Sequence, residues 1–195
     1  MRIKLLALVA IGLSVGLVAP AEAKLQPVWT NISPATSPIT VSWINGNSSG
    51  TTQVTYSPSA TGIWSYDGNL PNQNPSVIEQ NMVTQFGLSS GTLSQVVLCG
   101  NASTCTTGGD GTTHTATWST GKNYYDYLAV HYGQGELFFH FAKPIDSFSI
   151  QGLHNGLSNF YGYSDGAPAP AVPEPMPVLL LAAGLAGLIW RQRRS

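Results

Sequence analysis

Two strands and a turn lie in the second half of this 195-residue chain: Tyr124-Tyr-Asp-Tyr-Leu-Ala-Val-His-Tyr132, Gly133-Gln-Gly135 and Glu136-Leu-Phe-Phe-His-Phe141. Aromatic and β-branched residues favour strands, and a short glycine-containing connection between two strands favours a hairpin. Alternate side chains point to opposite faces. In the first strand Leu128, Val130 and Tyr132 share one face and Tyr127, Ala129 and His131 the other, and in the second strand Leu137, Phe139 and Phe141 oppose Phe138 and His140. Because both faces carry bulky side chains, we expect these strands to be central in a sheet.

The rest of the chain between residues 24 and 166 follows the same pattern. Further strands are predicted at residues 28–32, 39–44, 51–56, 61–66, 93–99, 113–118, 145–151 and 158–163, separated by Gly, Pro, Asn and Ser turns. Lys143-Pro144 is expected to end the second strand of the central hairpin. About nine short strands and one helix predict a mainly β fold, an antiparallel β-sandwich or jelly roll.

One helix is predicted after residue 75. Ser76-Val-Ile-Glu79 matches a capping box, in which the serine and glutamate side chains would each accept from a backbone N–H at the helix start. Ile78, Met82 and Phe86 lie one turn apart, and Gly87 is suited to the C-cap. We interpret this apolar stripe as core packing.

The first 23 residues have the pattern of a secretory signal peptide. Arg2 and Lys4 precede an apolar run, and Ala21 and Ala23 form an Ala-x-Ala site that places cleavage after Ala23. The alternative is an uncleaved N-terminal anchor. The region 24–166 is then a secreted domain, long enough for one hydrophobic core.

Charge is scarce in that domain. Lys24, Lys122 and Lys143 are its basic residues, and its seven acidic residues give it a net charge of about −4. A chain without a basic patch is unsuited to nucleic-acid binding. Low charge with abundant Gly, Ser, Thr, Asn and aromatic residues is typical of an extracellular β domain.

The two cysteines, Cys99 and Cys105, are six positions apart. In an exported protein a close pair predicts a disulfide. The alternative, a metal site with two thiolates, needs further ligands, and none is adjacent in the sequence.

The last 29 residues have three parts in order. A Pro/Ala-rich stalk at 167–175 contains Pro173-Glu174-Pro175 and is expected to be extended. An apolar helix follows within 176–195 and ends at Trp190, ahead of Arg191, Arg193 and Arg194. The aromatic residue and the arginines predict a transmembrane helix with a cytoplasmic basic tail, although its roughly 20 Å of apolar length is short for a bilayer. A buried terminal helix after an ordinary stalk is the alternative.

These three parts together resemble the PEP-CTERM sorting signal of bacterial proteins. The resemblance covers about 25 residues. It implies recognition of Pro173, Glu174 and Pro175 by an exosortase, cleavage near the motif, and transfer of the domain to the cell surface or matrix of a Gram-negative bacterium that makes exopolysaccharide. The stretch from Tyr127 through Phe138 to Asn159 also resembles the domain ending common among PEP-CTERM proteins, which supports the fold more than an activity.

The remaining candidates for chemistry are histidines, acids and tryptophans. His131 and His140 lie in adjoining strands and could approach each other, and His114 and His154 are further imidazoles, but no metal-binding spacing accompanies them. We predict no metal, cofactor or catalytic residue. Asp126 and Glu136 are the acids that could form a glycosidase pair. The segment Gly109-Asp-Gly111 could contribute to calcium binding, although it lacks the run of acidic ligands of an EF-hand loop. The tryptophans that could stack on sugars are Trp29, Trp43, Trp64 and Trp118.

The sequence therefore predicts a non-enzymatic envelope protein. We expect it to be exported, anchored transiently in the inner membrane with its domain in the periplasm, and then delivered to the cell surface or exopolysaccharide matrix as a structural or adhesive component. The alternative is a carbohydrate-binding or carbohydrate-active envelope protein.

Overall fold

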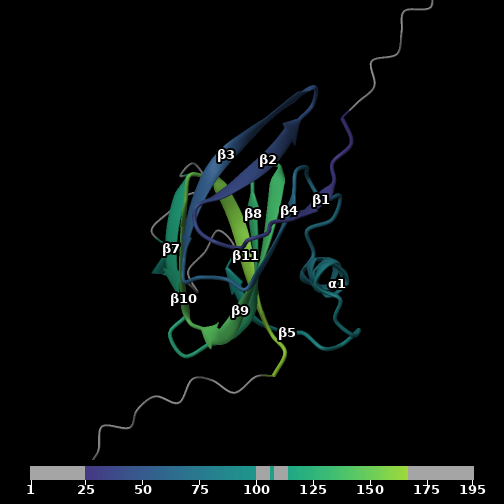
Figure 1. Ribbon diagram of the computed structural model, residues 1–195. Helices are drawn as coiled ribbons and strands as arrows, with labels where there is room; N and C mark the ends of the chain where they lie inside the picture. Colours follow the sequence, from purple (N-terminus) through teal and green to yellow (C-terminus); the bar gives the residue numbers. More distant parts are fainter. Residues whose placement is uncertain (1–24, 100–105, 108–113, 167–195) are drawn as a thin grey trace, which may run out of the picture.

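A computed structural model of the protein describes residues 25–99, 106–107 and 114–166 (Figure 1). Within these residues lie eleven strands and one helix. Their bounds are β1 Trp29–Asn31, β2 Ile39–Asn45, β3 Ser48–Ser57, β4 Gly62–Tyr66, α1 Pro75–Phe86, β5 Ser94–Cys99, β6 Thr106–Thr107, β7 Thr115–Ser119, β8 Tyr125–Tyr132, β9 Gly135–Ile145, β10 Ser147–Gln151 and β11 Leu157–Ser164.

The strands form two antiparallel sheets that pack face to face as a β-sandwich. One sheet has the order β1-β4-β9-β8-β11-β5 and the other β2-β3-β10-β7-β6. Both sheets supply the central core, with residues such as Leu128, Val130 and Phe139 from the first and Trp118 and Phe148 from the second. This confirms the predicted mainly β fold.

The central hairpin is β8 and β9, and both strands are internal to their sheet. Every residue of β8 is buried, as expected for a strand with bulk on both faces. Tyr132 pairs with Gly135, so Gly133 and Gln134 alone form the connection, in place of the predicted three-residue turn. This register places His131 opposite Glu136 and His140 opposite Tyr127.

The helix α1 covers the outer face of the six-stranded sheet (Figure 1). Ile78 and Met82 are fully buried there and Phe86 packs at the margin, which confirms the predicted core stripe. Gly87 ends the helix in the left-handed conformation at φ 67°. The predicted capping box is wrong, because the helix begins at Pro75 with Asn74 as N-cap and no side-chain cap hydrogen bond. A proline at the first helical position needs no N–H partner, so the helix starts before the serine.

The strand β9 also continues past the predicted break, through Lys143 and Pro144 to Ile145. The pairing of β4 with β9 ends at His140, so beyond it this edge of β9 has no β4 partner. A proline is tolerated where the ladder does not require its N–H.

The targeting predictions lie outside the described residues. These are the signal peptide with Ala21 and Ala23, the stalk with Pro173, Glu174 and Pro175, and the apolar segment with Arg191, Arg193 and Arg194. In the part of the chain that the structure describes, no helix has the length and apolar character needed to cross a membrane. Cys99 is buried in the core, but Cys105 is not among the described residues, so the disulfide stays a prediction.

Candidate functional site

The outer face of the five-stranded sheet is uncharged over β2, β3, β10 and β7, and it is polar except at Ile44 near the end of β2. Inward-pointing positions such as Val54, Trp118 and Phe148 fill the core, so the alternate positions face outward. Apart from Ile44 and Ser49 beside the β2–β3 turn, the outward residues of these strands are Thr40, Ser42, Thr51, Gln53, Thr55, Ser57, Thr115, Thr117, Ser119, Ser147, Ser149 and Gln151. All twelve carry a hydroxyl or an amide, and we call them the hydroxyl face.

A shallow groove follows β10 across this face. The small side chains of Ser147 and Ser149 lie between the neighbouring strands β3 and β7, because Ser149 pairs with Ser57 on one side and with Thr117 on the other. One part of the groove has a volume of about 480 Å³, and an adjoining part lined by Gln151 has about 250 Å³. The two parts share Ser57, Thr117 and Ser149, so we treat them as one feature and call it the β10 groove.

One end of the β10 groove lies where the chain crosses between the sheets. The loop from β7 to β8 and the turn from β9 to β10 meet there through Thr120. The Thr120 N–H donates to the Asp146 carbonyl at 2.7 Å. The single hydroxyl proton of Thr120 is shared between the carbonyls of Asn123, at 2.6 Å, and Asp146, at 3.0 Å. These bonds fix the backbone that carries Tyr124 and Asp146, which both line the groove.

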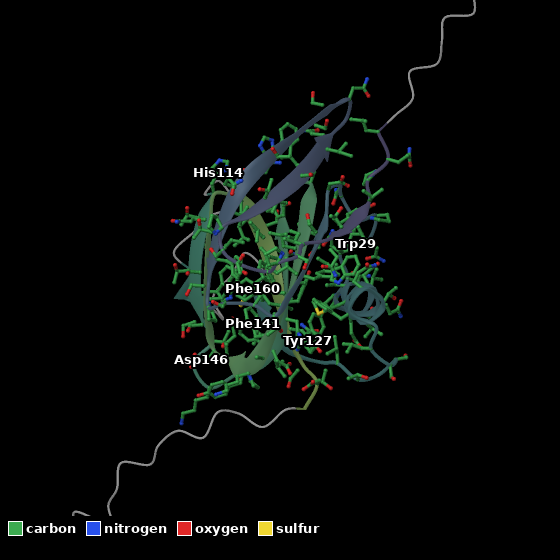
Figure 2. The ribbon with its side chains drawn as sticks, in the orientation of Figure 1. Trp29, His114, Tyr127, Phe141, Asp146 and Phe160 are labelled. Carbon is green, nitrogen blue, oxygen red and sulfur yellow. The ribbon has the colours of Figure 1, made fainter. Side chains whose placement is uncertain are left out.

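The side chains of Tyr124 and Asp146 are both half-buried. Neither the Tyr124 hydroxyl nor the Asp146 carboxylate is hydrogen-bonded to the described part of the chain. In Figure 2, Asp146 lies at the lower end of this side of the molecule and His114, which precedes β7, at the upper end. The groove therefore combines an aromatic ring, a carboxylate and a series of hydroxyls.

A second polar arrangement is buried on the opposite sheet. Tyr66, Glu136, His131 and Asn159 are register partners in turn across β4, β9, β8 and β11. The His131 Nδ1 lies 3.0 Å from the Glu136 Oε2, and both side chains are buried. The Tyr161 hydroxyl accepts from the Asn159 amide and donates to the Gln73 carbonyl, which joins this row to the loop before α1.

Burial raises the pKa of Glu136, and the hydrogen bond and charge of His131 partly offset this rise. A carboxylate beside an imidazole fixes which ring nitrogen holds the proton, as in the histidines of many catalytic and metal sites. The β10 groove, however, is lined by other residues. We therefore interpret the His131–Glu136 pair as a structural pair that crosslinks β8 and β9.

The other histidines are separated from this pair. The register places His131 opposite Glu136 and His140 opposite Tyr127, so the two histidines do not form a pair. His140 stacks on Tyr127 with ring centroids 4.5 Å apart and hydrogen-bonds the Thr61 hydroxyl, and burial lowers its pKa. His154 stacks on Trp43 at 3.7 Å, and His114 bonds the carbonyl of Leu153.

The considered glycosidase acids are also separated. Asp126 lies five positions before His131 on β8, a distance of about 16 Å along a strand, whereas Glu136 lies opposite His131. Asp126 instead contacts Asp165, whose N–H donates to the Asp126 carboxylate at 3.2 Å. Burial and the neighbouring Asp165 carboxyl raise the pKa of Asp126 to about 7. Sequence reasoning missed this pair because it joins residues 39 positions apart.

The described tryptophans do not gather on one exposed face. Trp118 is fully buried in the core, and Trp29 packs on Tyr66 and Phe138 on the side of the sheet that α1 covers. Trp43 stacks on His154 beside the β2–β3 hairpin. The predicted core packing of most tryptophans agrees with this arrangement, and Tyr124 is the half-exposed aromatic residue of the β10 groove.

Among the described residues no three His, Cys, Asp or Glu side chains lie close enough together to hold a metal ion. The Gly109-Asp-Gly111 segment lies outside them. In comparisons with protein-family models, curated proteins and solved structures, nothing matches this chain.

Proposed function

We propose that the chain is an exported bacterial envelope protein whose β-sandwich serves as a structural or adhesive component of the cell surface or exopolysaccharide matrix. The signal peptide at 1–23 directs export, and the segment 176–195 holds the protein in the inner membrane with the sandwich in the periplasm. An exosortase-type enzyme recognises Pro173, Glu174 and Pro175 and cuts near them.

The observation that carries the proposal is the uncharged hydroxyl face. Twelve outward positions on four strands carry a hydroxyl or amide, and a solvated β surface more often carries charged residues as well. A neutral surface rich in donors and acceptors suits hydrated, uncharged polymers better than nucleic acids or anionic membranes.

The alternative, a carbohydrate-binding protein, is favoured by the groove in this same face. A carbohydrate-active enzyme has less support, because the Asp126 and Asp165 carboxyls contact each other directly. Retaining and inverting glycosidases hold their carboxyls about 5–9.5 Å apart, with the bond to be cut between them.

Sorting is tested by deleting Pro173–Pro175 and following the protein through cell fractions. We expect the variant to accumulate in the inner membrane, uncut, while the wild-type protein reaches the surface or matrix fraction. A matched control deletes three stalk residues, Ala167–Ala169, and leaves the motif intact. If both deletions and the wild type fractionate alike, the sorting proposal is wrong.

A further inference from the structure

We propose that the β10 groove is a binding site for a single chain of a neutral polysaccharide, with a sugar ring on Tyr124 and sugar hydroxyls on Asp146. This inference rests on the proposed function, because it assigns a ligand class to the surface of the exported sandwich.

The shape of the groove favours an extended polymer over a compact ligand. It runs along β10 from Asp146, before the strand, to Gln151 at its end. Five strand residues span about 16 Å, the length of a short run of sugar rings. Ser147 and Ser149 of β10 line the groove together with Pro144 and Ile145, and β3 and β7 lie on its two sides. A polymer chain can therefore lie between β3 and β7 without any change in the sheet.

The chemistry of the groove favours a neutral ligand. Ser57, Thr117 and Ser149 lie side by side in register and present three hydroxyls, each able to donate and to accept. Sugar hydroxyls have the same dual capacity, so each can bond in either direction. Among the described residues, the one charged residue that lines the groove is Asp146, which would repel an anionic polymer and can accept from two hydroxyls of a neutral one.

Tyr124 adds an apolar surface at the same end. Its ring lines the groove beside Asp146, and Thr120 fixes the backbone between them. An aromatic ring and a polar group at one end of a polar site fix the orientation of a ligand that has both apolar and hydroxylated faces, as a sugar ring has.

The test measures binding of the full chain, kept in mild detergent, to hydroxyethyl cellulose, dextran, galactomannan and anionic alginate by affinity gel electrophoresis. We expect binding to at least one neutral polymer and none to alginate. Thr117→Lys, which places a long charged side chain in the groove, should weaken binding at least tenfold. Tyr124→Ala should weaken it roughly three- to tenfold, and Tyr124→Phe should restore it.

The matched control is Ser42→Lys, the same kind of change on the hydroxyl face but outside the groove. It should bind as the wild type does, and urea unfolding of each variant shows that the fold is intact. The inference is overturned if none of the neutral polymers retards the wild-type protein in the gel, if alginate retards it instead, or if Thr117→Lys and Ser42→Lys change its binding equally.

The two proposals fail in different experiments. Thr117→Lys leaves the sorting signal unchanged, so it should reach the same cell fraction as the wild type even when it no longer binds. If the motif deletion does not alter the cell fraction but Thr117→Lys abolishes binding, the sorting proposal is wrong and the groove assignment holds.

Discussion

Replacing Asp126 with asparagine should stabilise the protein above pH 7 and leave its stability unchanged near pH 4. Asp126 is buried beside Asp165, and these surroundings raise the pKa of its carboxyl from 3.8 to about 7. The folded chain therefore keeps a proton that the unfolded chain releases between these two pH values. The stability that this proton contributes is fully present below about pH 4 and is lost as the pH rises to about 7.

The magnitude follows from the two pKa values. At about 1.36 kcal/mol per pH unit, an interval of roughly 3 units corresponds to about 4 kcal/mol. Asp165 is exposed, so water screens part of the interaction, and we expect about 2 kcal/mol. Asparagine has nearly the same shape, and its carbonyl can still accept from the Asp165 N–H.

The assay is urea unfolding of the wild-type and Asp126→Asn chains, followed by tryptophan fluorescence from pH 4 to pH 9. The difference between the two chains at each pH cancels the titration of other groups, Glu136 included. Asp165→Asn serves as the control, since it removes the neighbouring charge but not the burial of Asp126. A difference that does not change with pH, or an asparagine variant that is less stable at pH 8, would refute this explanation.

Two further predictions concern the fold. Phe139 is fully buried between Tyr56 and Phe148. Phe139→Ala should therefore lower the free energy of unfolding, measured by urea titration, by about 3–5 kcal/mol. The control, Leu98→Ala at an exposed position, should lower it by under about 1 kcal/mol. Gly87 has a positive φ with no atom within 4 Å of an added Cβ, so Gly87→Ala should cost about 1 kcal/mol from the backbone alone. Ser89→Ala is its control, and equal stability of Gly87→Ala and wild type would contradict the cap assignment.

The parts of the fold that local pattern determines were predictable. In β8 and β9, alternation on both faces indicated central strands because each residue's face follows from its position alone. The register required one further detail, the length of the turn. A three-residue turn at Gly133–Gly135 would not place His131 opposite Glu136. The observed turn has two residues, with a positive φ at Gly133, and this shorter turn sets the register that pairs His131 with Glu136.

The candidate site was not predictable in the same way. The β10 groove depends on β10 lying between β3 and β7, and the pairing of Ser149 with Ser57 joins residues far apart in the sequence. A period of two shows which residues face outward but does not show which strands are neighbours. Tyr124 and Asp146 are similarly brought together by the hydrogen bonds of Thr120, which belong to loops rather than to strands.

The placement of α1 makes the two broad sides of the molecule unequal. The helix occupies the outside of one sheet, while the outside of the other is the hydroxyl face (Figure 1). Any layer of molecules attached through the hydroxyl face must therefore turn its helices away from the attachment surface. Two such molecules bound to opposite sides of one polymer would present helices on both outer surfaces, so the assembly could not continue by repeating the same contact. If the protein adheres through this face, as we propose, each side of a polymer would carry a layer one molecule thick.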